Sequence, residues 1–262
     1  MNLFDGILLL LQKEMKTPKA YGWFHLLFIG LTIGVIIYLF KIKKRRSEKQ
    51  LKKVLFIYGI VALILEILKQ ISWSFHYNQF GNIWDFEWYA FPFQLCSTPI
   101  YVSLICLFLK NTKIRKSLLS YLSFVTILGS IMTMIIPDSC FTSEILINVH
   151  TMWLHCGSFV VSIYLIISGF IKIDIESLKN AFIVFLIFVA IALGLNIVVY
   201  NSGVLNGETF NMFYISPYFI SSLPVFNFIQ QSVPYLIYLL TYIFAIGFGS
   251  FIVFYLVKFL KH

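Results

Sequence analysis

Residues 22–53 read GWFHLLFIGLTIGVIIYLFKIKKRRSEKQLKK, and this stretch decides the class of protein. Its first part, 22–40, contains no Asp, Glu, Lys or Arg, whereas 41–53 contains eight Lys and Arg. An apolar run of about 20 residues is long enough to span a bilayer as a helix. A basic cluster after such a run is typical of a loop on the cytosolic side. The stretch therefore predicts a membrane helix followed by a cytosolic loop that contacts anionic lipid headgroups.

The composition of the whole chain agrees with a membrane protein. Of the 262 residues, 60% are hydrophobic and only 12% are charged, whereas an ordinary soluble domain has about 25% charged residues. The net charge of +9 could suggest nucleic acid, but the basic residues lie between apolar runs. We therefore expect membrane phospholipids as partners and no nucleic acid. The four cysteines have no metal-like spacing, so we expect no metal site, no disulfide scaffold and no cofactor.

Seven apolar runs predict seven transmembrane helices, because the backbone groups of a segment in lipid must be satisfied within that segment. We predict an all-α, polytopic membrane protein whose seven-helix bundle occupies residues 21–262. An amphipathic helix in residues 1–20 is expected to lie in the membrane interface. We expect the connection 201–232, which is long and apolar, to fold back over the outer mouth of the bundle. The expected spans are about 22–40, 54–75, 91–109, 117–136, 146–171, 180–200 and 233–257.

The distribution of Lys and Arg predicts the orientation of the bundle. Sixteen of these residues fall in the loops 41–53, 110–116 and 172–179 and in the C-terminal tail, and only three fall on the opposite side, before the first span. The positive-inside rule then places the N-terminus outside and the C-terminus in the cytosol. We expect a multi-pass protein of the cell membrane, and the pattern does not indicate an oligomeric state.

Polar side chains inside the predicted spans are the candidates for function, because ionisable groups in a span usually face the bundle interior or a wet cavity. Glu66 and Gln70 share one face of the second span, and Lys69 can pair with Glu66. Most of the polar positions fall in the outer half of the membrane, so we expect one shared cavity that opens outward. Its expected lining is Glu66, Lys69, Gln70, Gln94, His150, Asn196 and Asn211.

A thiol near the outer end of the third span offers more specific chemistry. It lies in FPFQLCSTP (91–99), where we expect Pro92 to begin the helix. A cysteine attacks as its thiolate, and a neighbouring imidazole can take the proton. Cys96 and His155 are therefore a candidate nucleophile and base, and Gln94 could donate to a developing oxyanion. His150 and His155 lie about 140° apart around a helix, so at most one of them belongs to a tight site with Cys96.

Other interpretations of these residues stay open. Cysteine is common in apolar interiors as a small hydrophobe, and a buried histidine is often a satisfied core residue. The polar cavity could instead bind a small solute in a transporter or substrate-binding membrane subunit, with Glu66 and Lys69 as contacts. Transporters often have inverted repeats and broken helices, and neither is clear in this sequence. A structural membrane protein without catalysis is the third interpretation.

Three segments, taken in order, resemble one family. They are PFQLCS (92–97), His155 followed by Tyr164 and Leu165, and NMFYISP (211–217). On a seven-helix chain this order resembles the YwaF-like bacterial integral membrane proteins, which are relatives of the animal transmembrane protein 164 acyltransferases. The resemblance extends over about residues 20–260.

The resemblance implies a lipid acyltransferase, or an acyl hydrolase, that acts on phospholipid acyl chains. Carried over to this chain, it makes Cys96 the acyl-accepting nucleophile and His155 its general base, with Glu66 and Asn211 lining the site. Many of the bacterial relatives have histidine where this chain has Gln94, so a proton-transfer role at that position is lost here.

Overall fold

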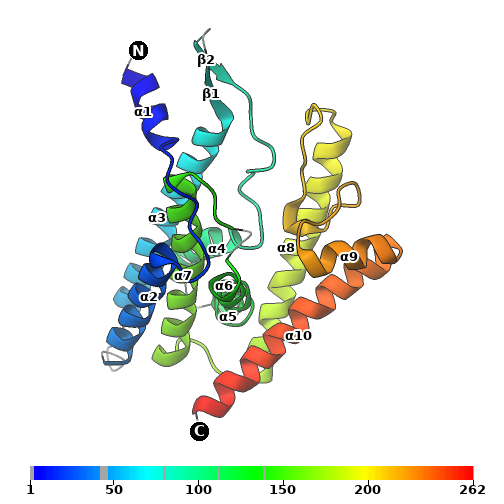
Figure 1. Ribbon diagram of the computed structural model, residues 1–262. Coiled ribbons are helices and arrows are strands. Elements are labelled where there is room, and N and C mark those ends of the chain that lie inside the picture. Colours follow the sequence, from blue (N-terminus) through cyan, green and yellow to red (C-terminus); the bar gives the residue numbers. More distant parts are fainter. Residues whose placement is uncertain (1–2, 42–46, 79–80, 111, 138–139, 262) are drawn as a thin grey trace.

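The computed structural model describes residues 3–41, 47–78, 81–110, 112–137 and 140–261, and in these residues the chain is a helical bundle with one small hairpin (Figure 1). Residues 42–46 of the predicted basic loop lie outside the described residues. The elements are α1 (Leu3–Leu11), α2 (Trp23–Lys41), α3 (Glu48–Ser74), β1 (Phe75–Asn78), β2 (Gly81–Trp84), α4 (Thr98–Phe108), α5 (Lys113–Phe124), α6 (Thr126–Ile135), α7 (Ile145–Ser168), α8 (Ile175–Asn201), the 3-10 turn η1 (Met212–Tyr214), α9 (Pro224–Ser232) and α10 (Tyr235–Lys261).

Six of the seven predicted spans correspond to helices that are long and apolar enough to cross a membrane. Within the described ranges these are α2, α3, the consecutive pair α5 and α6, α7, α8 and α10. Many large apolar side chains on their outer faces are exposed, as on Leu27 and Leu31 of α2 and Leu240 and Phe244 of α10. Such continuous apolar faces are stable against lipid but not against water.

The third predicted span, 91–109, differs from the expectation. Its helix α4 has only 11 residues and begins at Thr98 rather than at Pro92. Eleven residues rise about 16 Å, roughly half of a 30 Å hydrocarbon core. The proline in the first turn is Pro99, where a missing N–H costs little because the N–H groups of a first turn have no partner within the helix. Residues 91–97 are therefore a non-helical segment that leads into α4.

Two glycines let α3 approach its neighbours closely. A Cβ on Gly157 of α7 would lie 2.8 Å from the Tyr58 ring of α3, and a Cβ on Gly59 of α3 would lie 2.9 Å from the Leu104 side chain of α4. Side chains at either position would force the helices apart. Helix α3 consequently packs against both α4 and α7, which brings polar groups from three segments together.

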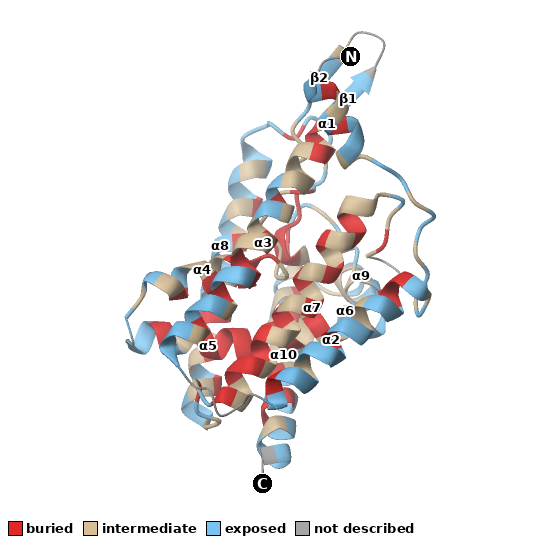
Figure 2. Cartoon of the chain, turned by 90° about the vertical axis from the view of Figure 1, so that its left-hand side faces the viewer, coloured by how far each residue is buried: buried red, intermediate tan, exposed pale blue. Residues whose placement is uncertain are grey.

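The long connection after α8 enters the bundle. Phe210, Met212, Phe213 and Ile215 are fully buried, and they belong to the same hydrophobic core as residues of α3, α5 and α8. The segment therefore folds back onto the bundle as expected, and the expectation that it covers the outer mouth stays a prediction. In Figure 2, buried residues gather in the interior of the bundle, and exposed residues colour the outer faces of its helices.

The N-terminal segment lies along the end of the bundle that carries the β1–β2 hairpin, which we call the hairpin end (Figure 1). The helix within the predicted amphipathic segment covers only Leu3–Leu11. Beyond it, the Gln12 side-chain amide donates to the backbone oxygens of Ser72 and Phe75, both at 2.7 Å. Met15 N donates to Ser143 O at 2.7 Å. These bonds fix residues 12–15 between the end of α3 and the start of α7.

Candidate functional site

A buried carboxylate, Glu66 on α3, is the centre of the candidate site. Lys69 Nζ lies 2.6 Å from Glu66 Oε1, and His150 Nε2 lies 2.5 Å from Glu66 Oε2. The side chains of Glu66, Lys69 and His150 are only 2%, 11% and 7% exposed. An ionised carboxylate is costly to bury unless it is paired and hydrogen-bonded. Both oxygens of Glu66 meet that condition.

Helical geometry accounts for this cluster. Lys69 is three residues after Glu66, so the two side chains lie on the same face of α3. His150 comes from the second turn of α7, which packs against α3. Because the pairing on α3 is local, it could be predicted from the sequence. The contact with His150 depends on the rotation of α7 about its axis, so it could not be predicted from the sequence.

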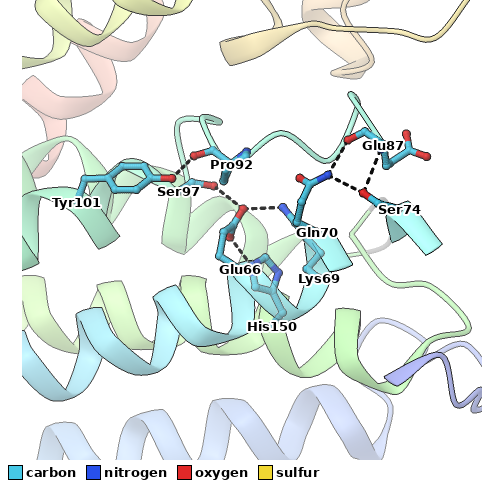
Figure 3. Close-up of polar contacts among 9 residues, drawn as sticks. All are labelled: Glu66, Lys69, Gln70, Ser74, Glu87, Pro92, Ser97, Tyr101 and His150. Carbon is cyan, nitrogen blue, oxygen red and sulfur yellow. Dashed lines mark hydrogen bonds and ion pairs between the residues drawn. The ribbon is translucent and has the colours of Figure 1, made fainter. Parts of the chain in front are cut away.

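The segment before α4 reaches the same carboxylate through Ser97. The Ser97 hydroxyl donates to Glu66 Oε1 at 3.4 Å, and Tyr101 donates to Pro92 O across the turn that holds this segment (Figure 3). Ser97 is 2% exposed. Ser97 is not among the site residues expected from the sequence, although it lies inside PFQLCS beside the candidate nucleophile.

Cys96 is a free, partly exposed thiol next to this cluster. The charged side chains within electrostatic reach of its sulfur are Glu66 and Lys69. Within the described residues, no other side chain forms a hydrogen bond with the Cys96 sulfur. The expected nucleophile therefore lies at the edge of the charged cluster rather than inside a hydrogen-bonded network.

The two histidines of α7 differ in their surroundings. His150 pairs with Glu66, whereas the His155 side chain, five residues further along, makes no hydrogen bond to any described residue. The structure thus brings His150, and not His155, to the carboxylate.

Gln70 links the cluster to the hairpin end. Its Nε2 donates to Ser74 Oγ and to Glu87 O, both at 3.0 Å. Figure 3 shows that these residues continue from Glu66 along α3 toward the segment that contains Glu87. A line of polar side chains therefore runs from the buried cluster to the hairpin end.

Three expected site residues remain, and their side chains hydrogen-bond to the backbone of the segment after α8. They are Gln94, Asn196 and Asn211. Gln94 Nε2 donates to Asn211 O at 3.0 Å, and its Oε1 accepts from Phe213 N at 2.9 Å. Asn196 Oδ1 accepts from Met212 N at 2.7 Å, and its Nδ2 donates to Met212 O at 3.0 Å.

Asn211 holds the same segment from within, because its Oδ1 accepts from Ser216 N at 2.8 Å. Phe213 and Tyr214 both have a φ of 59°, a conformation that costs non-glycine residues about 1–3 kcal/mol each. The amide contacts offset that strain. These contacts give Gln94 and the two asparagines a structural role, and their expected role in lining the substrate cavity stays a prediction.

Comparison with known proteins adds one finding. Residues 19–256 match the TMEM164 family. The chain belongs to the TMEM164 family. Comparison with curated proteins gives no match, and neither does comparison with solved structures.

The TMEM164 match includes the entire candidate site, from Glu66 and Cys96 to His150 and Asn211. It also includes all or most of each of the six long apolar helices among the described residues. Membership of this family and these helices together make the chain a multi-pass membrane protein. Its apolar outer faces therefore contact lipid.

Proposed function

We propose that this TMEM164 family member is a membrane enzyme that removes acyl chains from phospholipids, with Cys96 as the nucleophile. The acceptor is a lysophospholipid in an acyltransferase and water in an acyl hydrolase. The observation that carries the proposal is the Glu66 carboxylate. This carboxylate lies buried between His150 and Ser97. Ser97 is the residue that follows Cys96 in the chain.

The chemistry takes two steps. The Cys96 thiol gives its proton to an imidazole, and the thiolate attacks the ester carbonyl carbon. The new C–S bond forms, the ester C–O bond breaks, and the glycerol oxygen takes the proton back from the imidazolium. In the second step the hydroxyl of a lysophospholipid, or water, attacks the thioester while the imidazole accepts its proton. The cysteine leaves as the thiol, so the enzyme is restored.

We assign the role of base to His150 rather than to His155. Glu66 faces Nε2 of His150 at 2.5 Å, which leaves Nδ1 to receive the proton. A carboxylate beside an imidazole fixes the ring and stabilises the imidazolium that forms. His155 has no such partner among the described residues. Lys69 holds the other oxygen of Glu66, and its ammonium can also attract a lipid phosphate.

The orientation of the bundle belongs to the same proposal. The basic residues of the described chain gather at the end opposite the hairpin, for example Lys52 and Lys53 on α3, Lys113 and Lys116 on α5. We infer that this end faces the cytosol of a cell membrane and that the hairpin end faces outward. An epitope tag at the C-terminus should then be inaccessible to antibody in intact cells, and labelling of intact cells would contradict this orientation.

The proposal is tested by looking for the acyl-enzyme. The purified chain, in nanodiscs of phosphatidylcholine with a labelled acyl chain, should acquire label on the peptide that contains Cys96. Hydroxylamine should release that label, because the bond is a thioester. Cys96→Ala should abolish both the label and the release of lysophospholipid. Cys156→Ala is the matched control, because it removes a buried thiol outside the candidate site.

Two outcomes would overturn the proposal. The first is lipid turnover that is unchanged in Cys96→Ala. The second is label that survives in this variant while the protein remains folded by size-exclusion chromatography. Uptake of a small solute that survives Cys96→Ala but is lost in Glu66→Ala would favour a transporter instead.

A further inference from the structure

A second polar feature lies at the hairpin end and takes no part in the chemistry above. It is a cavity of about 660 Å³, which we call the hairpin cavity. Four segments line it: the N-terminal residues 9–14, the end of α3 with His76 of β1, the segment after β2, and the start of α7. The residues that matter for its chemistry are Glu14, Ser72, Trp73, Glu87, Tyr89 and Glu144.

The hairpin cavity is strongly acidic. Three carboxylates line it, from Glu14, Glu87 and Glu144, and its described lining contains neither Lys nor Arg. A fourth carboxylate, Glu208, lies beside Glu87. Burial raises the pKa of Glu87, and the Glu208 carboxylate raises it further. Like charges close together in a partly buried site disfavour each other's ionised forms. His76, which also lines the cavity, offsets only part of this effect on Glu87, so a cation in the cavity would stabilise it.

Two buried polar atoms of the hairpin cavity have no partner among the described residues. They are Ser72 Oγ and Glu144 Oε2. Ser72 is only 1% exposed, so water from the surface does not readily satisfy its hydroxyl. The second oxygen of Glu144 accepts from Trp73 Nε1 at 2.8 Å, which fixes the carboxylate in place. Buried polar groups are normally hydrogen-bonded, so two orphans in one cavity point to a ligand.

Aromatic faces complete the hairpin cavity. Trp73 and Tyr89 both line it, and their rings stack with centroids 6.4 Å apart and an angle of 26° between the planes. Aromatic faces attract cations, and quaternary ammonium groups are recognised by aromatic walls of this kind. Among the described residues, no three His, Cys, Asp or Glu side chains converge as metal ligands do. Spread carboxylates with aromatic walls suit a cation larger than a metal ion.

We propose that the hairpin cavity binds an organic ammonium group, of the kind carried by choline and ethanolamine. Glu87 and Glu144 supply the countercharge, Trp73 and Tyr89 supply the aromatic walls, and Ser72 supplies a polar contact at the base. The group can belong to a phospholipid headgroup or to a free cation. The proposal goes beyond the acyl chemistry and stands without it.

The position of the cavity relates it to Glu66. Trp73 lies seven residues beyond Glu66 on α3, which corresponds to about 10 Å along the helix axis. Gln70, which lies between them, donates to Glu87 O. A phospholipid headgroup in the hairpin cavity would therefore be held one to two helical turns from the buried cluster. This relation matters only if the proposed acyl chemistry is correct.

The test measures binding directly, so that it does not depend on turnover. The full chain is reconstituted in nanodiscs of phosphatidylglycerol, which carries no ammonium group. Tetramethylammonium and choline are titrated against sodium at equal chloride concentration, with tryptophan fluorescence and isothermal titration calorimetry as readouts. We expect saturable binding of both ammonium ions and none of sodium.

Variants then localise the binding. Glu144→Gln keeps an acceptor for Trp73 but removes the charge, and Glu87→Gln removes the charge of the second carboxylate. Each should weaken ammonium binding by at least about tenfold, or about 1.4 kcal/mol. Trp73→Phe keeps an aromatic face and should weaken it less. Glu176→Gln, at the exposed start of α8, is the matched control and should bind as the wild type does.

A second arm separates the two sources of the ammonium group. Short-chain phosphatidylcholine is compared with short-chain phosphatidylglycerol in the same assay. Tighter binding of the phosphatidylcholine than of choline identifies a lipid headgroup, and the reverse order identifies a free cation. Absence of saturable ammonium binding overturns the proposal. Equal affinity in the wild type and both glutamine variants, with all proteins folded by thermal unfolding, overturns it as well.

Discussion

His150 Nε2 of α7 lies 2.5 Å from Glu66 Oε2 of α3, with both side chains almost fully buried. This contact joins two helices at the level where the Cys96 segment enters the bundle. Lys69 occupies the other oxygen of the same carboxylate. One carboxylate therefore holds a histidine and a lysine, and removal of its charge should affect both stability and chemistry.

Glu66→Gln should destabilise the folded bundle. The amide keeps some hydrogen-bonding capacity, but it leaves the buried Lys69 ammonium without a countercharge. Loss of one partner of a buried ion pair typically costs about 3–5 kcal/mol. The measurement is the free energy of unfolding in detergent, with Glu176→Gln as a control at an exposed position. A Glu66→Gln protein as stable as the control would show that the buried pair adds no net stability.

His150→Gln and His155→Gln should separate the two histidines of α7. If His150 is the base, its loss should lower acyl-thioester formation on Cys96 by about 10²–10⁴-fold, the usual contribution of general-base catalysis. His155→Gln should lower it far less. Single-turnover labelling of Cys96 by a labelled phospholipid measures both variants. The opposite ranking would return the role to His155, as the resemblance in the sequence implied.

The histidines illustrate what the sequence can predict. The apolar runs predicted the six long helices, because about 20 apolar residues specify a span without further context. The angle between His150 and His155 was also predictable, since it follows from 100° per residue. Which of the two faces Glu66 depends on the rotation of α7 against α3. The close approach of Gly157 to Tyr58 belongs to that packing, and no local pattern specifies it.

The prediction of a helix over residues 91–109 was wrong in its first part, before Thr98, for a related reason. Pro92 and Pro99 both satisfy the sequence rule for a first helical turn, but only Pro99 lies in the first turn of the helix, which begins at Thr98. The difference lies in Gln94, whose side chain binds the backbone of Asn211 and Phe213. A contact across 117 or 119 residues cannot be inferred from the local polarity of the segment. The same contact gives Gln94 a structural role, whereas its expected contact with substrate stays a prediction.

Gln94→Leu should therefore loosen the segment after α8. It removes two hydrogen bonds and leaves Phe213 N–H without its partner, which costs about 1–3 kcal/mol when the group is buried. Asn196→Leu should have a similar effect, because it leaves Met212 N–H and C=O unpaired. Faster limited proteolysis within residues 205–221 and a lower free energy of unfolding are the expected results. Unchanged stability together with lost lipid turnover would instead support a role for Gln94 at the substrate.

The pair Glu87 and Glu208 should make stability depend on pH. The pKa of Glu87 is raised, first by burial and then by the Glu208 carboxylate, while the neighbouring His76 acts in the opposite direction. A raised pKa means that the folded state binds the proton more tightly than the unfolded state. The stabilisation is therefore fully present below the unfolded pKa, near 4.5. It is lost as the pH rises through the higher folded value.

The stability of the wild type, measured by thermal unfolding between pH 4 and pH 7, should accordingly contain a component that decreases as the pH rises above the ordinary glutamate range. Glu87→Gln removes the titrating group and should flatten that component, whereas Glu176→Gln should leave it in place. Choline at saturating concentration should also flatten it, because a bound cation offsets the charge of the Glu87 carboxylate. An identical pH profile in the wild type and Glu87→Gln would mean that the pKa of Glu87 is not raised in the folded protein.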